Sequence, residues 1–327
     1  MKRVRTPTRL SVALLSAGFL LFLGWPWLTA RGGIHCQAMS MALFHGCLAL
    51  AWNICSMMGA VSLGHTAFFG LGAYGSALLC HYGHLNPFLT IPLGGILGAF
   101  YGVLWHIAFG KLRGAPFALA SLASVEIPKV IIDNWESFTF GSLGVVGIPP
   151  LSPIRVGSFM LDFGENPVHL YHLFLVGTLF LCLLYRQALR SRWGWAVRTI
   201  REDETAAASL GVNVRRTRLQ VFICSAFLTG ICGGVYAHLM GLVEPALVFS
   251  LHISALPLVL SIFGGRFQWY GPLLGAVVLY PLDQVVFRSL FPVGHSALYG
   301  FVVILTLMLF PQGMGAWLQK RLHLASS

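Results

Sequence analysis

Residues 59–74 read Gly59-Ala-Val-Ser62-Leu-Gly64-His65-Thr-Ala-Phe68-Phe69-Gly70-Leu-Gly72-Ala73-Tyr74, and Gly75 follows directly. The stretch is apolar and rich in glycine, and the same pattern recurs at Gly230, Gly233 and Gly234. Glycine at the contacts between membrane helices lets two backbones approach closely. Glycine also occurs where transporters break a helix along the substrate path. The pattern therefore predicts tightly packed membrane helices, with a broken helix on a substrate path as the alternative.

The composition of the whole chain extends this prediction. Of 327 residues, 57% are hydrophobic and 9% are charged, and the mean hydropathy is +0.77. Soluble domains carry about 25% charged residues, so the composition excludes a soluble enzyme, a disordered protein and a nucleic-acid-binding module. The excess of 21 Lys and Arg over 10 Asp and Glu fits membrane topology better than a phosphate-binding face. We expect an all-α integral membrane protein with a single domain over residues 1–327.

Ten apolar runs approach or exceed the length needed to cross a bilayer, which for a helix is about 20 residues. They cover residues 10–30, 36–57, 60–82, 88–110, 115–133, 168–185, 218–241, 249–264, 271–290 and 295–312. Glycine and proline interrupt several of them, so eight spans is the alternative to ten. The first run is too long for the apolar region of a signal peptide and lacks a clear small-x-small cleavage site, so we expect an uncleaved first span.

The distribution of positive charge predicts which loops face the cytoplasm, because short cytoplasmic loops are enriched in Lys and Arg. Ten spans that start from a cytoplasmic N-terminus place residues 186–217, with seven arginines, inside. They place residues 134–167, with Arg155 as the one basic residue, outside. Both termini are then cytoplasmic. The external loop is rich in glycine and proline and predicts an ordered loop with a short hairpin around residues 158–163.

The internal loop contains a short predicted helix. Glu202, Asp203 and Glu204 favour its first turn, because acidic side chains suit the positive end of the helix dipole. The alanines at 206–208 favour helix, and Gly211 supplies the left-handed residue that ends it. Two interpretations fit this segment: a docking element for a cytoplasmic partner, or an inert connector.

The sequence contains no motif for catalysis or metal binding that we recognise. It has no Gly-x-x-x-x-Gly-Lys-[Ser/Thr], His-Glu-x-x-His or Gly-x-Ser-x-Gly, so we expect neither ATP hydrolysis by this chain nor an enzyme. The seven cysteines form no Cys-x-x-Cys pair, and the twelve histidines include one close pair, His81 and His84. We therefore predict neither disulfides nor a metal site.

Charged side chains inside the predicted spans need an explanation, because placing a charge within the bilayer costs free energy. Glu126, Lys129 and Asp133 share one helical stripe, where Glu126 and Lys129 can pair. Pro128 interrupts this stripe and frees backbone carbonyls, and Asp283 stands alone in the run at 271–290. Structural pairing is one interpretation of these acids. The alternative is a self-contained, ion-coupled secondary transporter that uses Glu126, Asp133 or Asp283.

Five stretches in order along the chain resemble motifs of the branched-chain amino acid permeases of ABC importers, the LivM type. They are residues 59–74; 117–127, starting Phe117-Ala-Leu-Ala; Thr139-Phe-Gly141-Ser-Leu-Gly144-Val-Val-Gly147-Ile148-Pro149; Arg201-Glu-Asp-Glu204-Thr-Ala206-Ala207-Ala-Ser-Leu-Gly211-Val-Asn213; and a C-terminal series from Gly264-Gly265 to Phe310-Pro311-Gln312-Gly313. The similarity covers about residues 35–315 and implies the fold of an ABC importer permease.

The resemblance also implies that the transporter contains several subunits with different roles. Permeases of this type form a heterodimeric channel with a second, related permease. Two cytoplasmic subunits bind and hydrolyse ATP, and a periplasmic binding protein delivers the amino acid. The resemblance thus implies a chain that binds no cofactor itself, has no nucleic-acid partner, and lies in the bacterial inner membrane.

Candidate site residues follow from the same resemblance and from the polar residues inside the predicted spans. Residues 201–213 resemble a degenerate importer Glu-Ala-Ala loop with Thr205 where the general motif has Glu, and small alanines would let the helix enter a groove of the ATPase subunit. The candidate coupling residues are Arg201, Glu202, Asp203, Glu204, Ala206, Ala207 and Gly211. The candidate translocation-path residues are Asn53, Ser62, Gly64, His65, Phe68 and Glu126.

Three departures from the family pattern bear on the substrate. Leu143 stands where the family usually has Asp, Gln312 where Glu is common, and His65-Thr66 interrupts an otherwise small or apolar pattern. Related permeases carry urea, short amides and other amino acids. These solutes are therefore the alternatives to leucine, isoleucine and valine.

Overall fold

The structure is a computed structural model that describes residues 22–27, 29, 33–156, 159–164, 166–310 and 313–317. Helices dominate this part of the chain, as predicted. In chain order they are α2 (Ile34–Met57), α3 (His65–Gly83), α4 (Pro87–Phe109), α5 (Gly114–Ala123), α6 (Glu126–Asn134), α7 (Glu136–Thr139), the 3-10 turn η1 (Gly141–Leu143), α8 (Pro167–Arg190), α9 (Arg192–Glu202), α10 (Glu204–Ser209), α11 (Val214–Met240), α12 (Pro245–Val248), α13 (Leu251–Gly264), α14 (Gly271–Pro281), the π-helix η2 (Leu282–Phe287), α15 (Arg288–Leu290) and α16 (His295–Leu309).

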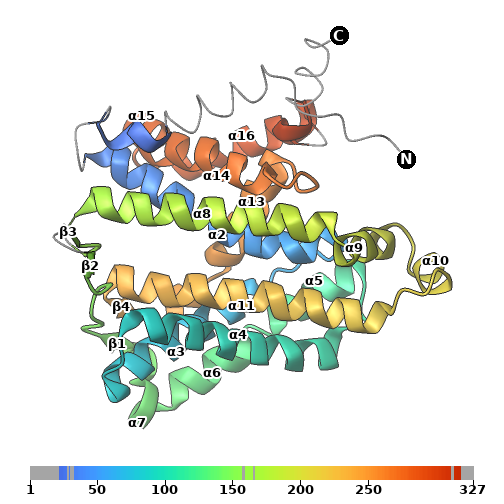
Figure 1. Ribbon diagram of the computed structural model, residues 1–327, viewed down its shortest axis with the longest axis horizontal. Coiled ribbons are helices and arrows are strands. Elements are labelled where there is room, and N and C mark those ends of the chain that lie inside the picture. Colours follow the sequence, from blue (N-terminus) through green and yellow to red (C-terminus); the bar gives the residue numbers. More distant parts are fainter. Residues whose placement is uncertain are drawn as a thin grey trace.

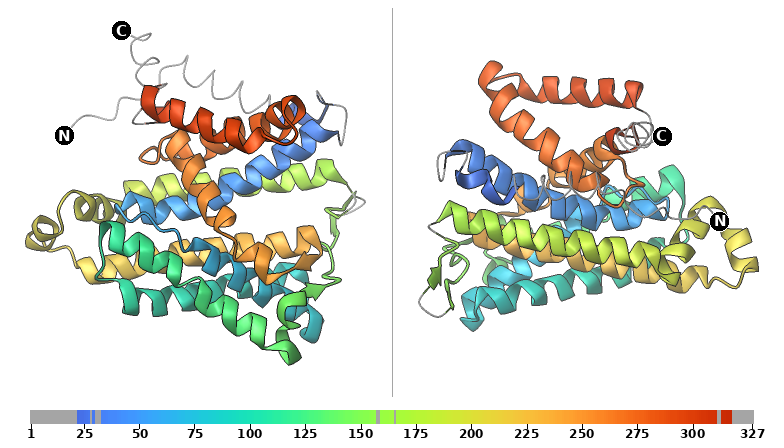
Figure 2. Two further views of the ribbon diagram at one scale, coloured as in Figure 1. Left: turned by 180° about the vertical axis from the view of Figure 1, so that it is seen from behind. Right: turned by 45° about the horizontal axis from the view of Figure 1, so that its top comes forward.

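The two polar loops lie at opposite ends of the helix bundle. In Figure 1, α2, α4, α8 and α11 run lengthwise across the molecule, with α9 and α10 at one end and the short strands at the other. The same separation is visible from behind and after rotation (Figure 2). The predicted loops at 134–167 and 186–217 therefore emerge from opposite ends of the spans.

Two small antiparallel sheets occur in the described residues, both at the end opposite α10. β1 (Val145–Val146) pairs with β4 (Leu242–Val243) and so joins the first polar loop to the end of α11. β2 (Ile154–Val156) pairs with β3 (Phe159–Leu161), which confirms the predicted hairpin. Its first strand begins before residue 158, and Ser158 itself lies outside the described residues.

Side-chain caps explain where several helices begin. Asn86 and Asn166 each precede a proline, and each side chain accepts a hydrogen bond from the backbone two residues later, at the starts of α4 and α8. Proline suits the first helical position because its missing N–H has no partner there in any case. Ser191, Asp203 and Asn213 cap α9, α10 and α11, and each of these side chains accepts a hydrogen bond from the backbone N–H three residues later.

Glycines bring α3, α4 and α11 into close backbone contact. A Cβ at Gly72 would overlap the carbonyl oxygen of Gly230, and one at Gly233 would overlap that of Phe69. A Cβ at Gly94 would overlap the carbonyl oxygen of Gly72. These positions confirm the prediction of close packing through small residues, which gains dispersion contacts that larger residues would prevent.

The apolar runs correspond to helical segments. Within the described part of the chain, seven segments are long and apolar enough to cross a membrane: Ile34–Met57, Pro87–Phe109, Gly114–Asn134, Pro167–Arg190, Val214–Met240, Pro245–Gly264 and Gly271–Leu290. The predicted runs at 60–82 and 295–312 contain α3, which has 19 residues but is less apolar, and α16, which has 15 residues. Most of the predicted first span, residues 10–30, lies outside the described residues.

Two predicted spans differ in detail. The run at 60–82 becomes helical only at His65, because Gly59 has a φ of +89° and the chain then runs without regular structure to residue 64. The run at 115–133 is divided into α5 and α6 at Ser124–Val125. The break lies four residues before Pro128, whose ring cannot donate to the carbonyl of Ser124. That carbonyl accepts a hydrogen bond of 2.7 Å from the Tyr101 hydroxyl, so it is not left free for solvent or substrate as the sequence suggested.

Candidate functional site

The predicted coupling helix is α10, and a single aspartate separates it from α9. Asp203 Oδ1 accepts hydrogen bonds from the Ala206 backbone N–H at 2.9 Å and the Thr205 hydroxyl at 2.6 Å. The Thr205 hydroxyl, followed by the backbone amides of Ala206 and Thr205, lowers the pKa of Asp203, because these donors stabilise the ionised carboxylate. The expectation of three acids in the first turn was therefore wrong in detail. Glu202 ends α9, Asp203 is the cap, and Glu204 alone opens α10.

The end of α10 matches the sequence prediction. Gly211 has a φ of +82°, and no atom lies within 4 Å of the place where its Cβ would be, so it is the backbone conformation that requires glycine there. The Val212 N–H donates to the Ala207 carbonyl at 3.0 Å and closes the turn.

The alanines of α10 face different surroundings. Ala206 is exposed, whereas Ala207 is fully buried against the chain itself. The small residues proposed to enter a partner groove therefore include Ala206 but not Ala207. The exposed residues of α10 are Thr205, Ala206, Ala208 and Ser209, and Leu210 directly after the helix is exposed as well. Thr205, Ala206, Ser209 and Leu210 share one face by helical spacing, and we call these four residues the docking surface. Leu210 was not singled out from the sequence, although a leucine within a polar segment was a visible signal, and in the structure its side chain is 64% exposed.

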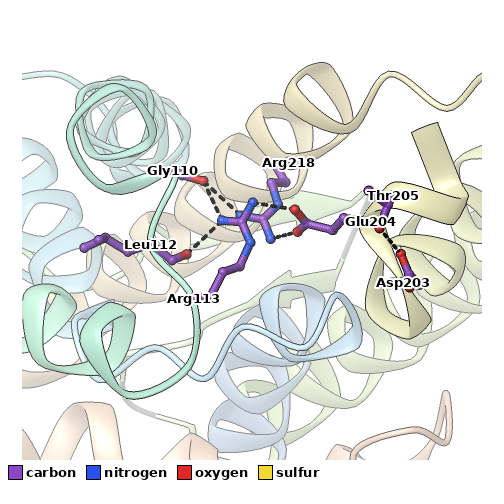
Figure 3. A network of polar contacts seen from close by, with 7 residues as sticks. All are labelled: Gly110, Leu112, Arg113, Asp203, Glu204, Thr205 and Arg218. Carbon is purple, nitrogen blue, oxygen red and sulfur yellow. Dashed lines mark hydrogen bonds and ion pairs between the residues drawn. The ribbon is translucent and has the colours of Figure 1, made fainter. Parts of the chain in front are cut away.

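Glu204 pairs with two arginines, Arg113 in the turn before α5 and Arg218 on α11 (Figure 3). Its Oε2 lies 2.6 Å from Nη2 of Arg113, and its Oε1 pairs with Nη2 of Arg218. Arg218 is 7% exposed and also donates to the Gly110 carbonyl at 2.8 Å. Arg113 donates to the carbonyls of Gly110 at 3.0 Å and Leu112 at 2.8 Å. We call Arg113, Glu204 and Arg218 the Glu204 clamp.

Sequence reasoning missed both arginines of the clamp. Arg113 is 91 positions from Glu204, and no local pattern connects them. Arg218 opens an apolar run, and a cation at that place requires a partner, so this signal was present. The other coupling candidates lie beside the clamp. Arg201 pairs with Glu202, and its guanidinium lies 4.5 Å from the centre of the Phe267 ring.

A cavity of about 450 Å³ adjoins the clamp. It is lined on one side by residues of the α9–α10 segment, including Arg201 and Glu204, and on the other by Gly59, Ala60 and Phe117. Of the irregular segment at residues 58–64, residues 58–60 line the cavity. Apolar packing beside the cavity also joins the two parts, because Met58, Ile200 and Ala207 belong to one buried cluster.

Three of the candidate path residues meet where the irregular segment contacts α5. The His65 ring bonds to the Ser62 hydroxyl at 2.9 Å through Nδ1 and to the Ser225 hydroxyl at 2.8 Å through Nε2. A Cβ at Gly64 would overlap the carbonyl oxygen of Ser121 at the end of α5. The Leu63 N–H donates to the Ser121 hydroxyl at 2.9 Å. The segment is therefore fixed between α5 and α11 by direct hydrogen bonds.

The other path candidates lie apart from this contact. Phe68 is fully buried. Asn53 Nδ2 donates to the Tyr185 hydroxyl at 3.0 Å and to the Arg266 carbonyl at 2.8 Å. Glu126 is exposed on α6 and lies 3.8 Å from Lys129, which confirms the predicted pair. Of the six candidates, Glu126 alone is exposed.

The acid at 283 lies where α14 changes into the π-helix η2. Its Oδ2 accepts a hydrogen bond of 3.0 Å from Gln284, while its buried Oδ1 has no hydrogen-bond partner among the described residues. Across the described residues, no group of three or more His, Cys, Asp or Glu side chains is arranged to hold a metal ion.

Comparison with known proteins gives a family match over most of the chain. Residues 36–310 match the family described as "Branched-chain amino acid transport system / permease component". The chain is 29% identical to the high-affinity branched-chain amino acid transport system permease protein LivM of Salmonella typhimurium, covering 95% of this chain and 76% of that protein. Identity to LivM of Escherichia coli is 29%, over 92% of this chain and 74% of that protein. A fructose import permease, FrcC of Rhizobium meliloti, is 27% identical over 72% of this chain and 64% of its own length. No solved structure was found to match.

Proposed function

Because this chain belongs to the family of branched-chain amino acid transport permease components, we propose that it carries branched-chain or related amino acids inward across the bacterial inner membrane. It is a multi-pass membrane protein and an ABC transporter permease, a subunit that does not itself hydrolyse ATP. The observation that carries the proposal is the similarity to LivM over nearly the whole chain. The exposed helix α10 at one end of the bundle supports a role in coupling.

The proposed assembly contains a second, related permease, two cytoplasmic ATP-binding subunits and a periplasmic substrate-binding protein. ATP is bound and hydrolysed by the partner subunits. The docking surface on α10 is the place proposed for an ATPase subunit, with Arg201, Glu202, Asp203 and Gly211 shaping the segment around it. Burial of Ala207 by its own chain argues that this residue supports the helix from inside.

The proposed translocation path runs along the side of the chain where Glu126 is exposed. Asn53, Ser62, Gly64, His65 and Phe68 are buried, and we propose that they hold the wall of the path in shape. The hydrogen bonds of His65 and the contact of Gly64 with α5 support this assignment. Movement of the irregular segment at 58–64 would be needed to expose them.

Amino acids are the favoured substrate class because the LivM relatives cover 92% and 95% of the chain. Sugar permeases cover less of it, as the fructose permease shows with 72%. Urea and short amides are the alternatives raised by the departures at Leu143 and Gln312. A self-contained, ion-coupled carrier is the alternative mechanism, favoured by the unpartnered Oδ1 of Asp283.

Reconstitution of the complete complex tests this function. We expect proteoliposomes containing both permeases and the ATPase subunits to accumulate labelled leucine, isoleucine or valine when the binding protein and ATP are supplied on their respective sides. Urea and fructose serve as competing solutes. The chain alone, under a proton or sodium gradient, should accumulate none of them. Accumulation driven by a gradient without ATPase subunits would establish the secondary carrier instead.

The orientation of the chain is open to a separate test. Ser137 and Thr205 are exposed at opposite ends of the bundle. We expect Ser137→Cys to react with a membrane-impermeant thiol reagent from the periplasmic side and Thr205→Cys from the cytoplasmic side. Of the seven native cysteines, Cys224 is the exposed one, so a Cys224→Ser background removes the main competing signal. Cytoplasmic labelling at Ser137→Cys would reverse the proposed topology.

A further inference from the structure

We propose that the Glu204 clamp connects the docking helix to α5, so that α5 moves with α10 and carries the movement to the irregular segment at 58–64. Arg113 and Arg218 are then positioning residues for coupling, in addition to the docking surface itself. The role rests on the proposed importer function, because it requires an ATPase subunit that moves α10.

The cytoplasmic end of α5 is tied directly to α10. Arg113 is the residue immediately before α5, and its guanidinium lies 2.6 Å from the Glu204 carboxylate. The same guanidinium bonds to the carbonyls of Gly110 and Leu112 at the end of α4. Glu204 is the first residue of α10. A displacement of α10 therefore acts on the turn between α4 and α5 through one carboxylate.

Arg218 anchors the same carboxylate to α11. Its guanidinium pairs with Glu204 and donates to the Gly110 carbonyl, which also accepts from Arg113. The side chain of Arg218 is 8% exposed, whereas that of Glu204 is 32% exposed. A buried guanidinium needs its counter-ion, which holds Glu204 in place more firmly than an exposed pair would.

The other end of α5 reaches the irregular segment. α5 has 10 residues, so it spans about 15 Å. At that end the Ser121 hydroxyl accepts from the Leu63 N–H at 2.9 Å, and its carbonyl lies against Gly64. Ser124 accepts from the Trp105 indole N–H at 2.7 Å. One helix thus joins the clamp to the segment that holds Ser62 and Gly64 and leads to His65 at the start of α3.

A cavity of about 450 Å³ lies beside the clamp, and its lining includes the α9–α10 segment and residues 58–60. Apolar packing also joins these two parts of the chain, because Met58, Ile200 and Ala207 belong to one buried cluster. The ionic link through Arg113 is a second connection, which runs through α5 to Gly64. The cavity gives the two sides room to approach one another.

The test uses the complete reconstituted complex and measures amino acid transported per ATP hydrolysed. For Glu204→Gln and Arg113→Ala we expect ATPase subunits to be retained, because the docking surface is unchanged. Transport per ATP should fall about tenfold, the scale of typical coupling between sites. Lys111→Ala is the matched control. It removes an exposed cation from the same turn, for which no ion pair is present among the described residues, and should leave the ratio unchanged.

A chemical tether separates a mechanical role from a structural one. The double variant Arg113→Cys/Glu204→Cys, in the Cys224→Ser background, should be uncoupled, and a short bifunctional thiol reagent should restore transport per ATP toward that of the parent. Transport per ATP is compared before and after tethering in the same preparation of the double variant. The comparison therefore does not depend on how abundant each variant is. The same reagent on the parent protein controls for the buried cysteines.

Each result is decisive. Normal transport per ATP in the clamp variants, or no recovery on tethering, would overturn the role of the clamp. Loss of the ATPase subunits from Glu204→Gln would overturn it too, because Glu204 would then belong to the docking surface. A parent complex that does not transport amino acids with ATP would instead overturn the proposed function, and the clamp role with it.

Discussion

Gly233→Ala should prevent stable folding, whereas Gly177→Ala should be tolerated. Both substitutions add one methyl group to a glycine inside a long helix, so helix propensity favours each by about 1 kcal/mol. They differ in their surroundings. A Cβ at Gly233 would overlap the carbonyl oxygen of Phe69 on α3 and lie 3.0 Å from the backbone nitrogen of Ala73, while no atom lies within 4 Å at Gly177 on α8.

The clash at Gly233 involves backbone atoms, so no side-chain rotation relieves it. The two helices must separate, and overpacking typically costs about 1–3 kcal/mol, with the upper end expected where the clash is between backbone atoms. We expect the Gly233→Ala protein to show greatly reduced abundance in membranes and early thermal unfolding in detergent. The Gly177→Ala protein should match the parent or exceed its stability slightly. Equal stability of the two variants would show that α3 and α11 do not pack through this glycine.

The features that could be predicted from the sequence depend on local chemistry. The lengths of the apolar runs predicted where the spans lie. The alanines at 206–208, followed by Gly211, predicted the short helix α10. The hairpin in the external loop followed from its turn residues. Each of these features is decided within a few residues or by one apolar run, so a single sequence contains the information.

The breaks within spans were only partly predictable. Pro128 indicated an interrupted helix, but the backbone carbonyl that lacks its helical hydrogen bond belongs to Ser124, four residues earlier. The carbonyl freed there is satisfied by Tyr101 from α4, a contact that only tertiary structure can supply. At the start of α3, the His65 ring likewise forms a hydrogen bond with the Ser225 hydroxyl, a partner 160 residues away in the sequence.

The candidate site shows the same limit. The coupling segment was placed correctly as a helix, but the outward side of a helix of 6 residues could not be decided, because its amphipathic pattern is too short. Ala206 and Ala207 are equivalent in the sequence and differ completely in burial. The Glu204 clamp joins α10, α11 and the turn before α5, and of its two arginines only Arg218, at the start of an apolar run, carried a signal in the sequence.

Ala206→Arg and Leu210→Asp should remove the ATPase subunits from the complex while leaving the permease intact. Both residues belong to the docking surface and are exposed in the chain. A long cation at position 206 would prevent close approach of the partner, and an ionised carboxylate at position 210 would be costly to bury in an interface. Loss of an interface anchor costs about 2 kcal/mol or more, which corresponds to about thirtyfold weaker binding.

The amount of ATPase subunit that co-purifies with the permease measures this effect directly, with stimulated ATP hydrolysis as the functional readout. Ser137→Arg adds the same charge at an exposed site on the opposite end of the bundle and should change neither quantity. Ala207→Arg provides the contrast within α10: because Ala207 is buried by its own chain, that variant should lower the stability of the permease itself. Unchanged retention and hydrolysis in both docking-surface variants would make α10 an inert connector, as the sequence alone allowed, and would move the search for the ATPase contact to the other exposed residues at this end of the bundle.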